Sequence, residues 1–100
     1  MAQRLMLLVF FLALGACAGL PPVKEYNLAN TAMNAAEKAN APSIAPGYWA
    51  RAKKNYLLAE KLYNKSNFSE AKEAFLRAKL FAERAENYIV LKIMREGGNL

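Results

Sequence analysis

The chain has no histidine, no aspartate and only one cysteine among its 100 residues. Without histidine and aspartate, neither a Ser-His-Asp nor a Cys-His catalytic arrangement can be built. Metal sites draw on histidine, cysteine and carboxylates, so apart from the cysteine only eight glutamates are available as ligands. These glutamates lie at helical spacing beside lysine and arginine, as surface charges do. The composition therefore predicts a protein that is not an enzyme and that carries no metal ion or dissociable cofactor.

The single cysteine, Cys17, follows the longest apolar segment of the chain. Arg4 precedes an unbroken apolar run from Leu5 to Leu14, which is the pattern of a secretory signal. The sequence Leu14-Gly15-Ala16-Cys17 resembles the bacterial lipobox. That resemblance implies cleavage of a signal peptide, residues 1–16, and a diacylglycerol on the Cys17 sulfur. It also implies a fatty acid such as palmitate on the new N-terminal amine, so the only prosthetic group expected is this covalent lipid.

Two other interpretations of the apolar segment compete with a lipid anchor. An uncleaved membrane helix would have only the 16 residues from Leu5 to Leu20 before Pro21-Pro22, whereas a span needs about 20. An ordinary signal peptide would leave one unpaired thiol in an oxidising compartment. Lipidation accounts for both the number and the position of the cysteine, and several acyl chains give stable anchoring.

The remainder of the chain shows helical periodicity and no strand alternation. We expect a lipidated tether over residues 17–23 and one helical domain over residues 24–100, with helices over 24–40, 46–64 and 68–96. Pro42 and Pro46 place a break over residues 40–47. The apolar positions expected to face the core are Leu28, Ala32, Ala35 or Ala36, and Ala39, then Trp49, Ala52, Tyr56, Ala59 and Tyr63, then Phe68, Ala71, Phe75, Ala78, Ala82, Ala85 and Ile89. The predicted fold is an all-α, up-down-up three-helix bundle dominated by a long antiparallel hairpin of residues 46–64 and 68–96.

The third predicted helix is about ten residues longer than its hairpin partner, an estimate that follows from 1.5 Å of rise per residue. The excess contains the most apolar part of the domain, and its candidate interface residues are Tyr88, Ile89, Val90, Ile93 and Met94. An exposed apolar patch of this kind marks a contact with another protein or with a second copy. The competing interpretation is that the segment around Ile44 folds over it.

Positive charge dominates the expected mature chain, which has 13 basic and 8 acidic residues and a net charge of +5. Export argues against nucleic acid as a partner, and leaves anionic lipids or cell-wall carboxylates. The candidate basic patch is Arg51, Lys53 and Lys54, either a contact for anionic headgroups or a solvated helix face. Glu73 and Arg77 are expected to form an ion pair four residues apart. The aromatic residues Trp49, Tyr56, Tyr63, Phe68 and Phe75 either line a groove for a peptide or glycan or form the bundle core.

Two resemblances involve the helical domain. Residues 67–78 resemble the second helix of a tetratricopeptide repeat, but Glu83 stands where a proline is expected and there is only one copy. The alanine-rich first helix, Ala45-Pro46, and the alanines after Asn67-Phe68 resemble a family of small alanine-rich bacterial envelope lipoproteins. That family is a domain of unknown function which also occurs ahead of OmpA-like cell-wall-binding domains. The resemblance implies a helical module that faces the periplasm, and it supplies no catalytic residues.

These observations predict a non-enzymatic lipoprotein of the cell outer membrane. Ala18 after the lipidated cysteine, in place of aspartate, is similar to lipoproteins sent to that membrane in Gram-negative bacteria. The domain is expected to contact another envelope protein or to self-assemble. The alternative is a binding module that holds a cell-wall fragment or lipid against Trp49, Tyr56 and the basic residues. A glutamate-dependent wall hydrolase is the third and weakest hypothesis.

Overall fold

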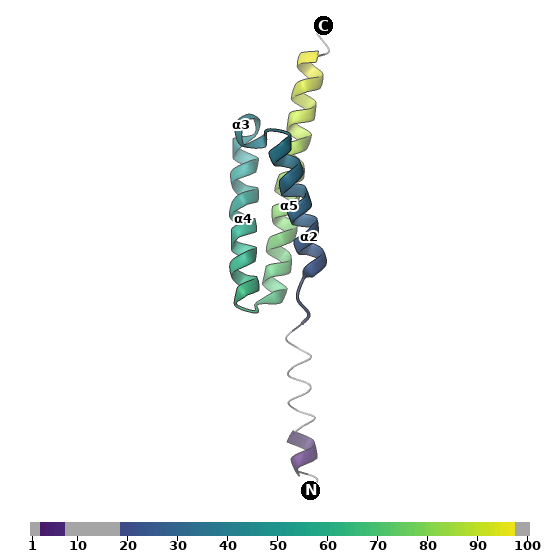
Figure 1. The fold of residues 1–100 in the computed structure, drawn as a ribbon, viewed down its shortest axis with the longest axis vertical. Helices are drawn as coiled ribbons and strands as arrows, with labels where there is room; N and C mark the ends of the chain where they lie inside the picture. The colour runs from purple at the N-terminus through teal and green to yellow at the C-terminus, as the bar shows by residue number, and fades with distance from the viewer. Residues whose placement is uncertain (1–2, 8–18, 98–100) are drawn as a thin grey trace.

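The computed structural model describes residues 3–7 and 19–97, and within these ranges every regular element is a helix (Figure 1). The main helices are α2 (Val23–Lys38), α3 (Ala41–Ile44), α4 (Pro46–Asn64) and α5 (Phe68–Gly97). Residues 3–7 are also helical. The all-α prediction is therefore confirmed for the described part of the chain, which contains more helices than the three expected.

Helix boundaries follow the residues that disturb regular backbone. Asn40 has a φ of 67°, a left-handed conformation that asparagine tolerates and that ends the path of α2. Pro46 begins α4 because its fixed φ suits a first helical turn, as expected from the sequence. The prediction of an unstructured break over residues 40–47 is wrong in part, because residues 41–44 form the single turn of α3. The first helix also ends two residues earlier than expected, at Lys38.

Helix α5 is the element on which the others pack. It runs without interruption for 30 residues, past Glu83 where a repeat helix would end. Both α4 and α2 pack along α5, whereas α2 and α4 have few contacts with each other. Figure 1 shows α4 beside α5, joined to it by a short turn, and α2 along another side of α5. A surface groove can therefore form wherever α2 and α4 diverge over α5.

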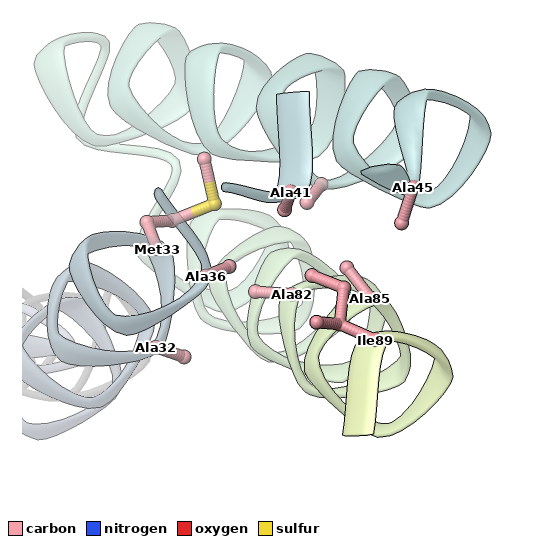
Figure 2. Packing of buried hydrophobic residues seen from close by; sticks show 9 residues of the cluster. Ala32, Met33, Ala36, Ala41, Ala45, Ala82, Ala85 and Ile89 are labelled. Atoms are coloured by element: carbon pink, nitrogen blue, oxygen red, sulfur yellow. The ribbon is translucent and has the colours of Figure 1, made fainter. Parts of the chain in front are cut away.

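The core consists almost entirely of alanine. One cluster joins all the main helices at the α3 end and contains Ala32, Met33, Ala36, Ala41, Ala45, Ala52, Ala82, Ala85 and Ile89 (Figure 2). The other lies toward the α4–α5 turn and contains Ala29, Ala59, Ala71, Ala74, Phe75 and Ala78. Alanine lets helices approach closely but buries little area per residue. The few large side chains, Phe75, Ile89 and Met33, therefore contribute a large share of the apolar burial.

The predicted stripe on the first helix is confirmed at Ala32 and Ala36 and is wrong at Leu28. Leu28 is exposed, and the buried residues of α2 are Ala29, Ala32, Met33 and Ala36. This register places the large Met33 side chain in the core, as Figure 2 shows. The stripes on the other two helices are confirmed at their small residues and at Phe75 and Ile89, which are all buried. Trp49, Tyr56, Tyr63 and Phe68 lie half-buried at the edges.

Candidate functional site

The free end of α5 is the first candidate site. Ile89 is only 3% exposed and packs in the cluster with Ala41 and Ala45, so its assignment to an exposed interface is wrong. From Val90 onward every described residue is exposed, and Figure 1 shows α5 continuing past α3. The hypothesis that residues 40–47 cover this end thus holds for Ile89 and not beyond it. We call the exposed apolar residues Val90, Leu91, Ile93 and Met94 the α5 tip.

The α5 tip combines apolar and charged side chains on one exposed helix end. Val90 and Leu91 are 53% and 55% exposed, and Ile93 and Met94 are 59% and 66% exposed. Lys92, Arg95 and Glu96 lie among them and are also exposed. Apolar residues interspersed with charges on one exposed helix end suit helix-on-helix docking. Tyr88 is 45% exposed, lines a hollow with Leu91 and Lys92, and also faces Tyr48 at a centroid separation of 6.4 Å.

The lipobox residues Leu14, Gly15, Ala16 and Cys17 lie outside the described residues, so the structure gives no geometry for the lipidation site. Leu20 is 89% exposed, and Pro22 directly precedes α2. Among the helices of residues 3–7 and 19–97, none has the length and apolar character needed to span a membrane.

Arg51, Lys53 and Lys54 of the candidate basic patch do not all lie on one side of α4, although Arg51 and Lys54, three positions apart, share a side. Arg51 lies over the Phe81 ring, with 5.8 Å between its guanidinium carbon and the ring centroid. Lys53 is two positions further along α4 and therefore points to a different side of the helix. Both Lys53 and Lys54 are exposed, and neither forms an ion pair within the described ranges. Arg51 instead groups with residues of α5, in particular Arg84, which lies 5.6 Å from the same ring.

A polar link between α4 and α5 was missed by the sequence reasoning. The Nε of Arg77 donates a hydrogen bond to Oδ1 of Asn55 at 3.0 Å, and Nδ2 of Asn55 donates to the carbonyl of Arg51 at 2.8 Å. The expected ion pair between Glu73 and Arg77 is absent from the described part of the chain. No sequence signal could have found this link. It depends on how two helices are rotated against each other, so that residues 22 positions apart in the sequence meet.

A groove of about 460 Å³ lies between the start of α2 and the end of α4, above α5. Its lining includes Val23, Tyr26, Asn27, Glu60, Tyr63 and Phe75. Of the five aromatic residues predicted from the sequence, only Tyr63 and Phe75 line this groove, while Tyr26 was not among them. Phe75 is fully buried, so the core interpretation is correct for that residue. Phe68 packs edge-on against Tyr63 at 5.5 Å between ring centroids.

Tyr56 is half-buried, and its ring lies beside Tyr26 and Phe75, which line this groove. Burial raises the pKa of Tyr56 from 10.0 to about 12, and the neighbouring Tyr26 and Glu60 add to the effect. Its hydroxyl donates to Oδ1 of Asn30 across α2 and α4 at 3.4 Å. Because the folded state keeps this proton more tightly, the contribution of Tyr56 to stability is complete below pH 10 and is lost as pH rises toward 12.

This shift gives a pH prediction. Between pH 10 and about 12 the free energy of unfolding should fall by about 2 kcal/mol more in the wild type than in Tyr56→Phe. Urea titrations of the two proteins at several pH values measure this difference. Parallel pH profiles for the two proteins would contradict the shift.

Metal ligands and ion pairs are the remaining features to consider in the described residues. No group of three or more cysteine, aspartate, glutamate or histidine side chains close enough to hold a metal ion occurs in residues 3–7 and 19–97. The two ion pairs found there are ordinary surface contacts, Lys72 with Glu25 at 3.9 Å and Lys79 with Glu83 at 3.6 Å.

When the chain was compared with known protein families, with curated proteins and with solved structures, no match was found. Function must therefore be inferred from the residues and their arrangement.

Proposed function

We propose that this protein is a non-enzymatic lipoprotein of the outer membrane, held by lipid on Cys17, whose helical domain faces the periplasm and docks through the α5 tip. In this proposal α2, α4 and α5 act as an up-down-up three-helix module dominated by the α4–α5 hairpin. The partner is another envelope protein or a second copy of the chain. The family resemblance of the alanine-rich helices is consistent with this role.

The observation that carries the docking proposal is the exposure of the four apolar residues of the α5 tip. Helix α5 could end near Ile89, where its packing partners end, without losing any core contact. It continues for two more turns in which Val90, Leu91, Ile93 and Met94 remain more than half exposed. Exposing such a segment is unfavourable unless a partner covers it, so a binding surface is the simplest explanation of its composition.

The size of the complex tests the docking proposal. Full-length lipid-anchored protein, extracted in a neutral detergent, should sediment as a complex larger than a monomer in its micelle. The Ile93→Asp variant should sediment as a monomer, because removing a carboxylate from water at the centre of the contact has a large free-energy cost. A wild type that is monomeric in cells and in detergent would contradict the proposal.

The lipid anchor has its own test. Cys17→Ser should abolish incorporation of labelled fatty acid into the protein, since the hydroxyl does not replace the thiol as acceptor, while synthesis of the chain continues. Immunoprecipitation from labelled cells measures both quantities. Equal labelling of the variant and the wild type would refute lipidation at Cys17 and leave the α5 tip as a separate question.

The second candidate is a binding module for a cell-wall fragment or a lipid. The observation that favours it is the 460 Å³ groove with Tyr26, Tyr63 and Phe75 in its lining, because aromatic surfaces with nearby amide and carboxylate groups suit sugar rings. This groove is remote from Trp49 and from the basic residues, so the ligand would lie elsewhere than the sequence suggested. Saturable quenching of intrinsic fluorescence by purified wall fragments would support it.

A further inference from the structure

Three arginines from two helices gather on the α4–α5 face. The guanidinium carbons of Arg51 and Arg84 lie 5.8 and 5.6 Å from the centroid of the Phe81 ring, so they are at most about 11.4 Å from each other. Arg77, one helical turn before Phe81, is held against α4 by its hydrogen bond to Asn55. We call Arg51, Arg77 and Arg84 the arginine face.

None of these positive charges is neutralised by a carboxylate in the described residues. The two ion pairs found there involve Lys72 and Lys79, and no arginine takes part. All three arginines are exposed, and the two that lie over Phe81 have part of their surface on the ring. A guanidinium is weakly hydrated, stacks on aromatic rings and presents paired N–H donors that match phosphate oxygens. In the described residues Arg51 and Arg84 therefore have their guanidinium groups unpaired with carboxylates and partly oriented by Phe81, whereas the Nε of Arg77 is already bonded to Asn55.

A hollow of about 360 Å³ adjoins the arginine face. Its lining includes Ile44, Pro46, Gly47, Tyr48, Arg51 and Tyr88, so Arg51 belongs to both features. The walls are apolar and aromatic, with the Tyr48 and Tyr88 rings 6.4 Å apart. A Cβ added at Gly47 would meet no atom within 4 Å, so the space above Gly47 is open. We call this space the Tyr48 hollow, and its volume is in the range of small-molecule sites.

We propose that the arginine face and the Tyr48 hollow together bind a phosphate group carried on an apolar or aromatic body. The body would occupy the hollow, and the phosphate would lie at its rim, where Arg51 and Arg84 reach it from opposite helices. Phosphate fits better than carboxylate because it has more acceptor oxygens and up to two negative charges, which several guanidinium groups can share. A phospholipid headgroup and a soluble phosphate ester have this chemistry in common. The site is independent of the lipid anchor and of the α5 tip.

Calorimetric titration of the full-length protein in a neutral detergent tests this proposal with three probes. Dihexanoyl phosphatidic acid represents a lipid, phenyl phosphate represents a soluble ester, and inorganic phosphate lacks the body. The double variant Arg51→Gln with Arg84→Gln removes the arginine pair. The matched control, Lys61→Gln with Lys65→Gln, removes the same charge from exposed positions at the far end of α4, outside the site. Gly47→Trp fills the hollow without a clash at its Cβ.

The expected result is saturable binding of at least one of the two organic phosphates, about tenfold or more tighter than inorganic phosphate. The arginine double variant should lose at least about tenfold in affinity and the lysine control less than about twofold, a contrast that rests on bidentate arginine contacts. Gly47→Trp should weaken the organic phosphates alone. Binding of phosphatidic acid without phenyl phosphate would assign the site to lipid, and binding of phenyl phosphate, with or without phosphatidic acid, would show that a soluble ester is sufficient. No saturable binding to any probe, or equal losses in the two double variants, would overturn the proposal.

Discussion

Phe75→Ala is expected to lower the free energy of unfolding by about 3–5 kcal/mol, the largest effect of any single truncation in the domain. Phe75 is the only large side chain that is fully buried in the described residues. Its ring meets Tyr26 at 5.4 Å and Tyr56 at 5.8 Å, both edge-on. The other buried residues of its cluster are alanines, which cannot move far enough to fill the space left behind. A small domain with a total stability near the low end of about 5–15 kcal/mol would then keep at most about 2 kcal/mol.

Urea unfolding followed by far-ultraviolet circular dichroism measures this loss. Leu57→Ala is the matched control, because Leu57 is 55% exposed on α4 and its truncation should change stability by less than about 0.5 kcal/mol. If Phe75→Ala lost under about 1 kcal/mol, the ring would not be the central packing residue of its cluster, and the alanine seams would have to hold the helices alone.

Ile89→Asp and Ile93→Asp are expected to have opposite consequences although they lie one turn apart on the same helix. Ile89 is 3% exposed, so an aspartate there removes apolar contacts and buries a carboxylate, at a cost of about 3 kcal/mol or more. Ile93 is 59% exposed, so the same change should leave the monomer within about 0.5 kcal/mol of the wild type. Ile93→Asp should nevertheless abolish the complex seen in neutral detergent.

Unfolding curves and sedimentation of the two variants separate folding from docking. A strong loss of stability in Ile93→Asp would show that Ile93 is part of the core. A variant that is stable and keeps its complex would show that the α5 tip is not the contact. Only the combination of normal stability and a lost complex agrees with the proposed function.

Helix type and the α4 boundary were predictable because proline and the alternation of large and small residues are strong local signals. Pro46 and Asn64 bound α4 as expected, and the third helix was misplaced by only one residue at its end. The buried face of α2 was predicted only in part: Ala32 and Ala36 are buried as expected, but Met33 and not Leu28 is the large core residue, because one alanine position resembles the next. Met33 is the large buried residue of α2, but in this alanine-rich helix several faces show the same apolar spacing.

The candidate sites were less predictable because they depend on contacts between helices. A single-turn helix at residues 41–44 covers Ile89, and no periodicity can be read from four residues. Arg51 and Arg84 meet on Phe81 from two helices, whereas adjacency in the sequence suggested Arg51 with Lys53 and Lys54. The excess length of α5, in contrast, followed from comparing the lengths of two helices, but the sequence left open whether the segment around Ile44 covers it.

Photo-crosslinking in cells from a probe at Ile93 tests the docking role of the α5 tip most directly. A second probe at Leu57 is the matched control, because Leu57 and Ile93 are similarly exposed, at 55% and 59%. The proposed function predicts a discrete adduct from Ile93 that is absent from Leu57, and an adduct of twice the chain mass would identify a second copy as the partner. No adduct from Ile93 at normal expression, or the same adducts from both positions, would contradict it.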